Sequence, residues 1–336
     1  MYHYNYVIFN SPDNNKLRRN PDGYYTICLQ ELESCEAIRV VSQPLDYMPY
    51  WVRLIYSIHN SAKLGKKVNL LLKSCWYPFY FKNDFNNDRP ICFVMLSRSI
   101  PLSYLEYLKK HYKGNKLVLL HRDLLKVCER CAPDLAHNPI FDLEMTFDQG
   151  ESKKYGFPHF NEFESKIDMA VKDTPECDVF FAGRSKDRLP LLLAVYNRLT
   201  QAGLTCHYYL TDVPLNNRVQ LPGITYAEHF MTYREMLYHT VNCRCVLEIN
   251  QGEADGYTSR FLEAVMYNKR LLTNNAFIKN SPFYRLGYIQ CFENASEINP
   301  EFVKECDSVD YHYNGEFSPY RMIERVDEEL VKRYGE

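Results

Sequence analysis

The chain of 336 residues is long enough for two domains of about 150 residues each. Its charges nearly cancel, with 40 Lys and Arg against 42 Asp and Glu, which argues against a nucleic-acid-binding protein that relies on bulk positive charge. The polar start MYHYNYVIFN predicts a first strand rather than a signal peptide, and no apolar run reaches the roughly 18 residues of a spanning helix. The 12 cysteines are scattered, which favours reduced thiols in the cytoplasm.

The first half alternates apolar runs with helical patterns, as in an α/β protein with a largely parallel sheet. Strands are predicted at 6–9, 24–29, 37–41, 68–72, 91–96, 117–120 and 141–147. Helices are predicted at 49–64, 101–112 and 123–131. The first helix is inferred from apolar residues at helical spacing, namely Trp51, Leu54, Ile55, Ile58 and Ala62. The absence of Gly-x-Gly-x-x-Gly and of a P-loop disfavours dehydrogenases and kinases.

One cluster contains residue types that bind metals: His121, Cys128, Cys131 and His137 lie within 17 residues. Its spacing fits no standard zinc finger, and 122–131 has the pattern of an amphipathic helix. Buried thiols are the simpler interpretation, so we predict no metal site.

The second half begins with a predicted strand at 177–182, followed by Gly183 and three cations at the start of a helix that ends near 202. Glycine lets a backbone approach a ligand, and a helix N-terminus attracts anions. Because the helix dipole disfavours cations there, Arg184 and Arg188 indicate a diphosphate site. A solvated basic helix start is the alternative. Further strands are predicted at 205–210, 223–226, 245–249 and 270–273, and helices at 232–241, 258–267 and 317–334.

The segment after strand 245–249 has three features of a binding loop. Asp255 and Glu263 are separated by seven residues, and Arg260 lies between them. A carboxylate can hold the vicinal hydroxyls of a ribose, while amides and an arginine at a helix start can hold a phosphate. Alternatively, Thr258 caps a core helix and Arg260 forms a surface pair with Glu263. The expected ligand-binding residues are Asn250, Gln251, Asp255, Gly256, Thr258, Arg260 and Glu263.

This segment resembles the donor-binding segment of the GT-B glycosyltransferases, in which an acid and a glutamate with this separation occupy the same loop and helix. Asp255 stands where a glutamate is usual. Gly183 and Arg184 match the Gly-Arg pair of that family, and 154–157 match the end of its first domain. The nearest resemblance is to bacterial enzymes of polysaccharide and lipopolysaccharide assembly, including the CgeB-like proteins.

The resemblance implies two Rossmann-like domains facing across a cleft. Residues 1–160 would bind the acceptor and 170–318 the nucleotide-sugar donor, and a C-terminal helix at 319–336 would return to the first domain. In the donor domain, Gly183, Arg184 and Arg188 would seat the diphosphate. The ribose would be held by Glu263 and the base would lie near Tyr226 and His229.

The implied activity is transfer of a sugar from a nucleotide-sugar to a glycan or lipid-linked acceptor. No Asp-x-Asp occurs, so we expect no metal, and no cofactor beyond the co-substrate. Asp123 is the expected catalytic base, with His59 and Asp46 as weaker candidates. Two alternatives stay open: a catalytically silent binding protein, and a nucleotide-sugar epimerase on the same fold. The expected location is cytoplasmic, with peripheral association at the inner face of the membrane left open.

Overall fold

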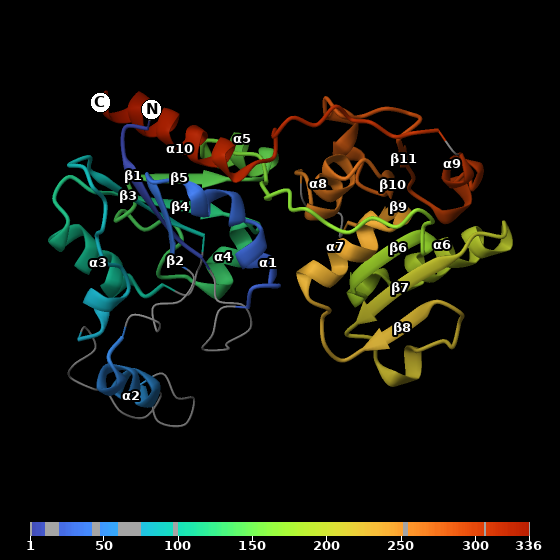
Figure 1. Ribbon diagram of the computed structural model, residues 1–336, viewed down its shortest axis with the longest axis horizontal. Helices are drawn as coiled ribbons and strands as arrows, with labels where there is room; N and C mark the ends of the chain where they lie inside the picture. The colour runs from blue at the N-terminus through green and yellow to red at the C-terminus, as the bar shows by residue number, and fades with distance from the viewer. Residues whose placement is uncertain are drawn as a thin grey trace. The chain divides into compact units, whose positions relative to one another are not determined.

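A computed structural model describes residues 2–10, 20–41, 48–59, 75–96, 100–250, 255–305 and 307–335, apart from the side chains of His59 and Lys186. The chain divides into two compact units (Figure 1). Unit 1 consists of Met1–Pro21, Cys28–Phe160 and Pro319–Glu336. Unit 2 consists of Asp22–Ile27 and Asn161–Ser318. A short piece of the N-terminal region therefore lies in the unit formed by the second half of the chain.

Unit 1 contains a parallel sheet whose described strands have the order β2-β1-β3-β4-β5. These strands are β1 (Asn5–Phe9), β2 (Ile38–Val41), β3 (Ile91–Met95), β4 (Lys116–His121) and β5 (Leu143–Thr146). The strands β1 and β3 are buried along their whole length and, apart from Asn5, carry apolar side chains, as expected of a parallel sheet with both faces covered.

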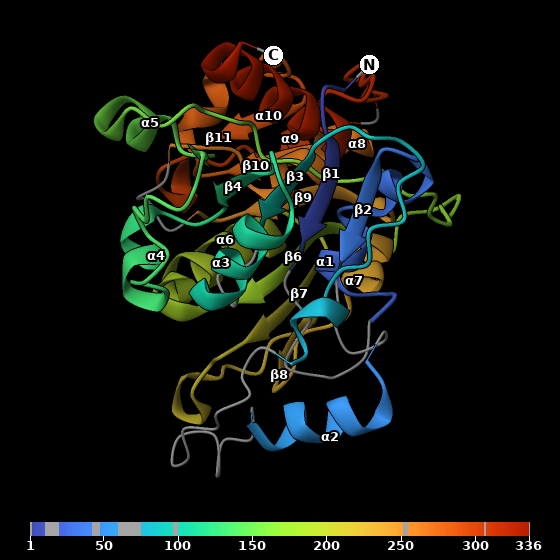
Figure 2. The ribbon, with the colours of Figure 1, turned by 90° about the vertical axis from the view of Figure 1, so that its left-hand side faces the viewer.

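The described helices of unit 1 connect its strands or flank the sheet, and one of them, α2, lies at the margin of the unit (Figure 2). They are α2 (Tyr50–His59), α3 (Leu102–His111), α4 (Leu125–Cys131), α5 (Gln149–Tyr155) and α10 (Pro319–Tyr334), with the 3₁₀ turns η2 (Gln30–Ser34) and η4 (Tyr77–Phe79). The last helix, α10, reaches the first strand: Asp327 accepts hydrogen bonds from the Tyr6 hydroxyl at 2.5 Å and from the His3 amide at 3.1 Å. The chain end is thus part of unit 1.

Unit 2 contains a second parallel sheet, with the strand order β11-β10-β9-β6-β7-β8. The strands are β6 (Cys177–Arg184), β7 (Cys206–Thr211), β8 (Ile224–Ala227), β9 (Cys243–Glu248), β10 (Arg270–Thr273) and β11 (Ile289–Cys291). Successive strands run outward from β6 to one edge and then from β9 to the other. The order reverses between β6 and β9, which is where open α/β sheets bind ligands.

Most helices of unit 2 follow a strand in the chain, as in a βα unit. They are α1 (Tyr24–Ile27), α6 (Leu189–Gln201), α7 (Tyr233–Val241), α8 (Ser259–Met266) and α9 (Glu301–Lys304). The 3₁₀ turns are η5 (Lys186–Arg188), η6 (Leu215–Asn217), η7 (Ala276–Asn280) and η8 (Ala295–Glu297). Within the described ranges, no helix is both long and apolar enough to cross a membrane.

The predicted strand at 24–29 is wrong, because residues 24–27 form the helix α1. The carbonyl of Gly23 accepts from the amides of Thr26 and Ile27, which closes a helical turn. Tyr24 packs edge-on against Tyr233 of α7, with ring centroids 5.0 Å apart. The β propensity of the Tyr-Tyr-Thr-Ile run yields to this tertiary packing.

The other predicted strands and helices that the structure describes are present with ends shifted by a few residues. The predicted strand at 68–72 and the end of the helix predicted at 49–64 lie outside the described residues. Two parallel sheets with connecting helices confirm the predicted α/β class with two Rossmann-like domains.

Candidate functional site

The ends of β6 and β9 diverge at the reversal of strand order in unit 2, and Arg188 bridges them. Its Nη1 donates to the carbonyl of Ile249, just beyond β9, and its Nη2 donates to the carbonyl of Arg184, at the end of β6. Its Nε is buried and has no hydrogen-bond partner among the described residues. Burial lowers the pKa of the Arg188 guanidinium; Asp187 opposes this shift and the positive charge of Arg260 adds to it. Two guanidiniums thus come within electrostatic reach of each other.

Arg184, at the end of β6, has a side chain that is about half exposed. Its Nε lies 3.1 Å from Oδ2 of Asp212, and its guanidinium lies over the ring of Phe230, 5.1 Å from the centroid. Both charged side chains of the pair are about half exposed, so the pair contributes at most about 1 kcal/mol and can be exchanged for another anion. Gly183 precedes it, and an added Cβ there would make an ordinary contact of 3.6 Å with the Phe181 ring.

The N-terminus of α8 is anchored by a buried acid. Thr258 is the N-cap and accepts a hydrogen bond from the amide of Phe261. The same hydroxyl donates to Glu248 at the end of β9, and the hydroxyl of Thr273 at the end of β10 donates to the other oxygen of that carboxylate. Burial raises the pKa of Glu248, opposed by these two hydrogen bonds and by the charge of Arg260. Glu248 therefore ties β9, β10 and α8 together.

Arg260 and Glu263 form an ion pair in the first turns of α8, but Glu263 is not at the surface. Its side chain is fully buried, whereas that of Arg260 is 23% exposed. One oxygen of Glu263 accepts from Arg260 and the other from the Tyr233 hydroxyl at 3.0 Å. Burial raises the pKa of Glu263, and the Arg260 charge opposes this shift. Glu263 thus holds the guanidinium of Arg260 in place, and the atoms of this pair that solvent can reach belong to Arg260.

Two asparagine side chains brace the loop between β9 and α8. Asn274 holds the backbone of Asn250, accepting from its amide at 2.5 Å and donating to its carbonyl at 3.1 Å. Asn275 donates to the carbonyl of Gly256 at 3.1 Å and caps η7. Asp255 is exposed at the mouth of this loop, and Gln251 lies outside the described residues. The side-chain amides of Asn274 and Asn275 thus hold the backbone on both sides of this loop.

The residues expected near the base lie in β8 and in the loop between β8 and α7. The Tyr226 hydroxyl exchanges hydrogen bonds with the amide and carbonyl of Val219, at 3.0 and 2.9 Å, so it closes a local turn. His229 is exposed, and its carbonyl accepts from the Tyr209 hydroxyl. The neighbouring Phe230 is half exposed and lies beneath Arg184.

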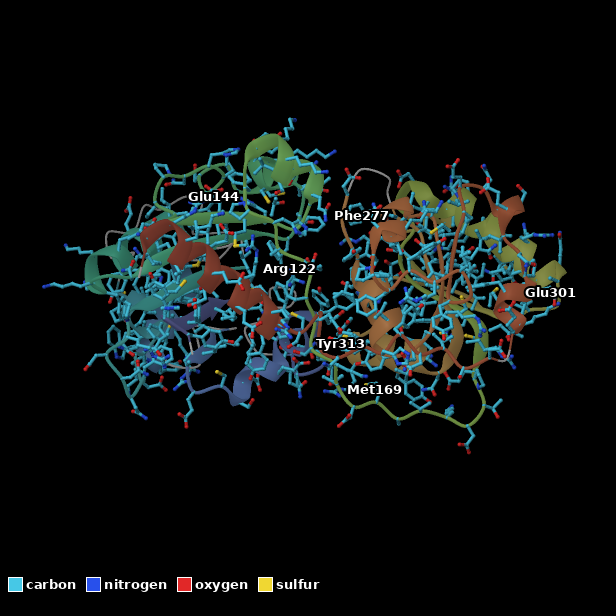
Figure 3. The ribbon with its side chains drawn as sticks, turned by 90° about the horizontal axis from the view of Figure 1, so that it is seen from above. Arg122, Glu144, Met169, Phe277, Glu301 and Tyr313 are labelled. Atoms are coloured by element: carbon cyan, nitrogen blue, oxygen red, sulfur yellow. The ribbon has the colours of Figure 1, made fainter. Side chains whose placement is uncertain are left out.

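Asp123 lies in unit 1, on the turn between β4 and α4, and is exposed. The preceding strand ends at His121, whose Nε2 is 2.9 Å from Oε2 of Glu144 in β5. Figure 3 labels Glu144 and also Arg122, which follows His121 in the chain. The alternative base Asp46 and the side chain of His59 lie outside the described residues. Asp123 thus lies just beyond the carboxyl end of β4, and its role as the catalytic base stays a prediction.

The cysteine and histidine cluster separates in the structure. His121 contacts Glu144, Cys128 is buried in α4, and His137 faces Glu129 with Nε2 3.3 Å from Oε1. Among the described residues, no three metal-binding side chains converge.

Three residues of this region were missed by the sequence analysis. Glu248 was treated as part of an apolar strand, although an acid within such a run is itself a signal, because a buried charge needs partners. Phe230 is an exposed aromatic in a polar loop. Asp212 has a left-handed backbone with φ of 59°, and no sequence pattern relates it to Arg184.

No protein-family model matches the sequence, and no curated protein matches it. Solved structures do resemble it. The structure of HepE from Anabaena, in complex with UDP and glucose, aligns with a TM-score of 0.52 over 98% of this chain and 100% of that chain, at 10% identity. AviGT4, a glycosyltransferase involved in avilamycin A biosynthesis, aligns with a TM-score of 0.54 over 98% of this chain and 96% of that chain, also at 10% identity.

The chain has the GT-B fold. The resemblance inferred from the sequence is thus confirmed at the level of the fold, and the alignment extends over both units. A relation to the CgeB-like proteins and a role in surface polysaccharides stay predictions. In a GT-B fold the candidate site of unit 2 lies at the carboxyl ends of β6 and β9, the usual position for a nucleotide in an open α/β sheet.

Proposed function

We propose that the protein is a glycosyltransferase that binds a nucleotide-sugar in unit 2, between the ends of β6 and β9. The observation that carries this proposal is the gathering of Arg184, Arg188 and Arg260 beside the N-terminus of α8 at the reversal of strand order. Guanidiniums that approach one another in a partly buried place favour an anion with more than one charge. The diphosphate of a nucleotide-sugar has that charge.

We propose a different role for each of the three arginines. Arg184 exchanges Asp212 for the diphosphate, at small cost because its present pair is exposed. Arg188 contributes charge and leaves its Nη atoms on the backbone. Arg260 contacts the ligand while Glu263 holds it in place. A direct contact between Glu263 and the ribose stays a prediction, and it requires the carboxylate to give up the bond from Tyr233.

Transfer joins an acceptor hydroxyl to the anomeric carbon of the sugar. The bond from that carbon to the diphosphate oxygen breaks, the hydroxyl proton goes to a base, and negative charge grows on the leaving nucleotide. Fixed guanidiniums and the α8 N-terminus stabilise this charge without a metal. We assign acceptor binding to unit 1, Asp123 to the base, and a glycan or lipid-linked glycan to the acceptor.

Thermal denaturation with nucleotides tests the donor site. HepE was solved with UDP and glucose, so UDP and UDP-glucose are tried first, followed by GDP, CMP and their sugars. A ligand at 100 times its Kd adds about 2.7 kcal/mol, which raises the Tm by a few degrees. We expect one nucleotide to do so, with or without EDTA, and Arg184→Gln to lose the shift.

Arg244→Gln is the matched control. The Nε of Arg244 lies 3.1 Å from Oδ1 of Asp178, the same distance as in the Arg184–Asp212 pair. This control pair lies at the amino ends of β6 and β9, whereas Arg184 lies at the carboxyl end of β6. Arg244→Gln should keep the full ligand shift. No shift with any nucleotide, or equal losses in both variants, would overturn the site. If the protein binds a nucleotide-sugar but releases no free nucleotide when acceptors are present, a catalytically silent binding protein is favoured. If it isomerises the sugar without transferring it, an epimerase is favoured.

A further inference from the structure

The short helix α1 comes from the N-terminal part of the chain, yet it packs beside α7 in unit 2 (Figures 1 and 2). Asp22 holds its start: the Asp22 carbonyl accepts hydrogen bonds from the amides of Tyr233 and Arg234 at 2.8 and 3.2 Å. Ile27 holds its end, because this side chain is fully buried in the core of unit 2. The single helical turn is therefore attached at both ends, and the fold sets the direction of Tyr24, which lies between them.

Tyr24 contacts two elements of the candidate donor site. Its ring packs edge-on against the ring of Tyr233 in α7, with an interplanar angle of 88° and centroids 5.0 Å apart. Its hydroxyl lies 3.3 Å from Oγ of Ser259, the first residue of α8. One side chain from the beginning of the sequence thus touches both helices that line this part of the site.

From Tyr24 the contacts continue to the guanidinium of Arg260. The Tyr233 hydroxyl donates to one oxygen of the buried Glu263, and Arg260 donates to the other oxygen. Tyr233 is only 7% exposed, so in a closely packed interior its ring cannot turn unless a neighbour moves. Ser259 directly precedes Arg260 in α8. Two routes therefore lead from Tyr24 to Arg260, one through side chains and one through the backbone of α8.

We propose that Tyr24 is a positioning residue of the donor site, and that it holds Arg260 where the guanidinium meets the diphosphate. This inference rests on the proposed function and adds to it a residue from the first half of the chain. Tyr24 does not contact the ligand; it acts by keeping Tyr233 and Ser259 in place. An arginine that is already ordered loses less conformational entropy when a ligand binds, so the contact of Tyr24 strengthens binding.

Titration calorimetry with UDP on the full chain measures this contribution. Tyr24→Ala should raise the Kd roughly two- to tenfold, the factor that corresponds to the loss of one edge-on ring pair. Tyr24→Phe keeps the ring and should restore most of the affinity. In a chain with Arg260→Gln, whose amide can still donate to Glu263, Tyr24→Ala should have little further effect, because residues that act through one group are not additive. An equal rise in Kd with and without Arg260 would assign Tyr24 a general structural role and overturn the inference.

Tyr288→Ala is the matched control. Tyr288 is partly buried, as Tyr24 is, and packs edge-on against Tyr311 with ring centroids 5.3 Å apart. Tyr311 is 7% exposed, the same fraction as Tyr233. Tyr288 precedes β11 and so lies at the amino end of its strand, away from the carboxyl ends that form the candidate site. This variant should keep the Kd of the parent, and a rise equal to that of Tyr24→Ala would contradict the proposal.

Hydrogen exchange without nucleotide tests the positioning separately from the proposed function. The amides of Phe261 and Leu262 donate to the hydroxyl and the carbonyl of Thr258, so they report on the first turn of α8. Tyr24→Ala should speed their exchange roughly two- to tenfold, and Tyr288→Ala should not. Unchanged exchange in Tyr24→Ala overturns the inference whether or not UDP binds. Faster exchange in a chain that binds no nucleotide supports the positioning of α8 and overturns the proposed function alone.

Discussion

Glu248 and Glu263 are buried in unit 2, and each accepts hydrogen bonds from two side chains. A buried carboxylate costs several kcal/mol unless its hydrogen bonds and a nearby cation offset the loss of water. Here the offset comes from side chains of β10, α7 and α8. These hydrogen bonds therefore fix the orientation of Thr258, Arg260 and Tyr233 within the fold.

His207 in β7 makes the stability of unit 2 depend on pH. Burial lowers its pKa below the ordinary 6.5, and the neighbouring His239 lowers it further, with ring centroids 4.8 Å apart; Glu176 opposes these effects. As the pH falls from 6.5 towards the folded-state pKa, the unfolded chain binds the proton first, so the free energy of unfolding decreases. We expect this slope, at most about 1.4 kcal/mol per pH unit for one proton, to be smaller in His207→Gln.

The measurement is urea denaturation at several pH values. His312→Asn is the control, because that side chain is exposed and Asn tolerates its left-handed backbone with φ of 54°. An unchanged slope in His207→Gln would assign the acid sensitivity to other groups, such as His159 of unit 1, whose pKa is also lowered by burial.

At the scale of elements, the hydroxyl of Thr258 both caps α8 and donates a hydrogen bond to the buried Glu248. Thr258→Ala removes the N-cap, at about 1 kcal/mol, and leaves the buried Glu248 with one donor fewer, at about 1–3 kcal/mol more. Thr232→Ala removes only a cap, from α7, where the hydroxyl accepts from the Glu235 amide at 3.2 Å. We expect the first variant to lose clearly more stability in urea denaturation than the second, and Thr258→Ser to keep most of it. Equal losses would show that the bond to Glu248 contributes nothing.

The sequence predicts where strands and helices lie better than it predicts which side chains of each element are buried or in contact. Apolar runs such as 91–96 and 245–249 identify buried strands, because parallel strands are covered on both faces. The spacing in 49–64 predicts a helix, but it does not distinguish Ile55, which packs inward, from Trp51, which points outward. Arg184 is recognisable from its position after a strand, whereas its partners Asp212 and Phe230 come from other strand ends.

At the scale of the whole molecule, the chain passes between the units four times, at 21/22, 27/28, 160/161 and 318/319. Each unit is therefore built from separated stretches. The carbonyl of Asp22 accepts from the amides of Tyr233 and Arg234 at the start of α7, and its carboxylate lies 2.6 Å from Nε of Arg234. A piece made of 161–318 alone lacks these contacts.

A chain that ends at Ser318 should lose the folding of unit 1. It lacks the buried α10 side chains Met322, Ile323, Val326 and Leu330, which together contribute roughly 6–12 kcal/mol, comparable to the stability of a whole domain of about 5–15 kcal/mol. Hydrogen exchange should detect unprotected amides in β1 and β3 while β6 and β9 stay protected. A chain that ends at Tyr334 is the control, and protected β1 amides in the shorter chain would contradict the expectation.

Because Tyr6 lies in β1 and Asp327 in α10, their contact forms only after α10 has been synthesised. A ribosome that adds roughly 5–20 residues per second makes β1 about 15–60 s before it makes α10. During that interval Tyr6 of β1 lacks its contact with Asp327, and unit 2 can be complete while unit 1 is not. A chain that is released before α10 has been made should therefore expose apolar side chains of unit 1, which chaperones and proteases recognise.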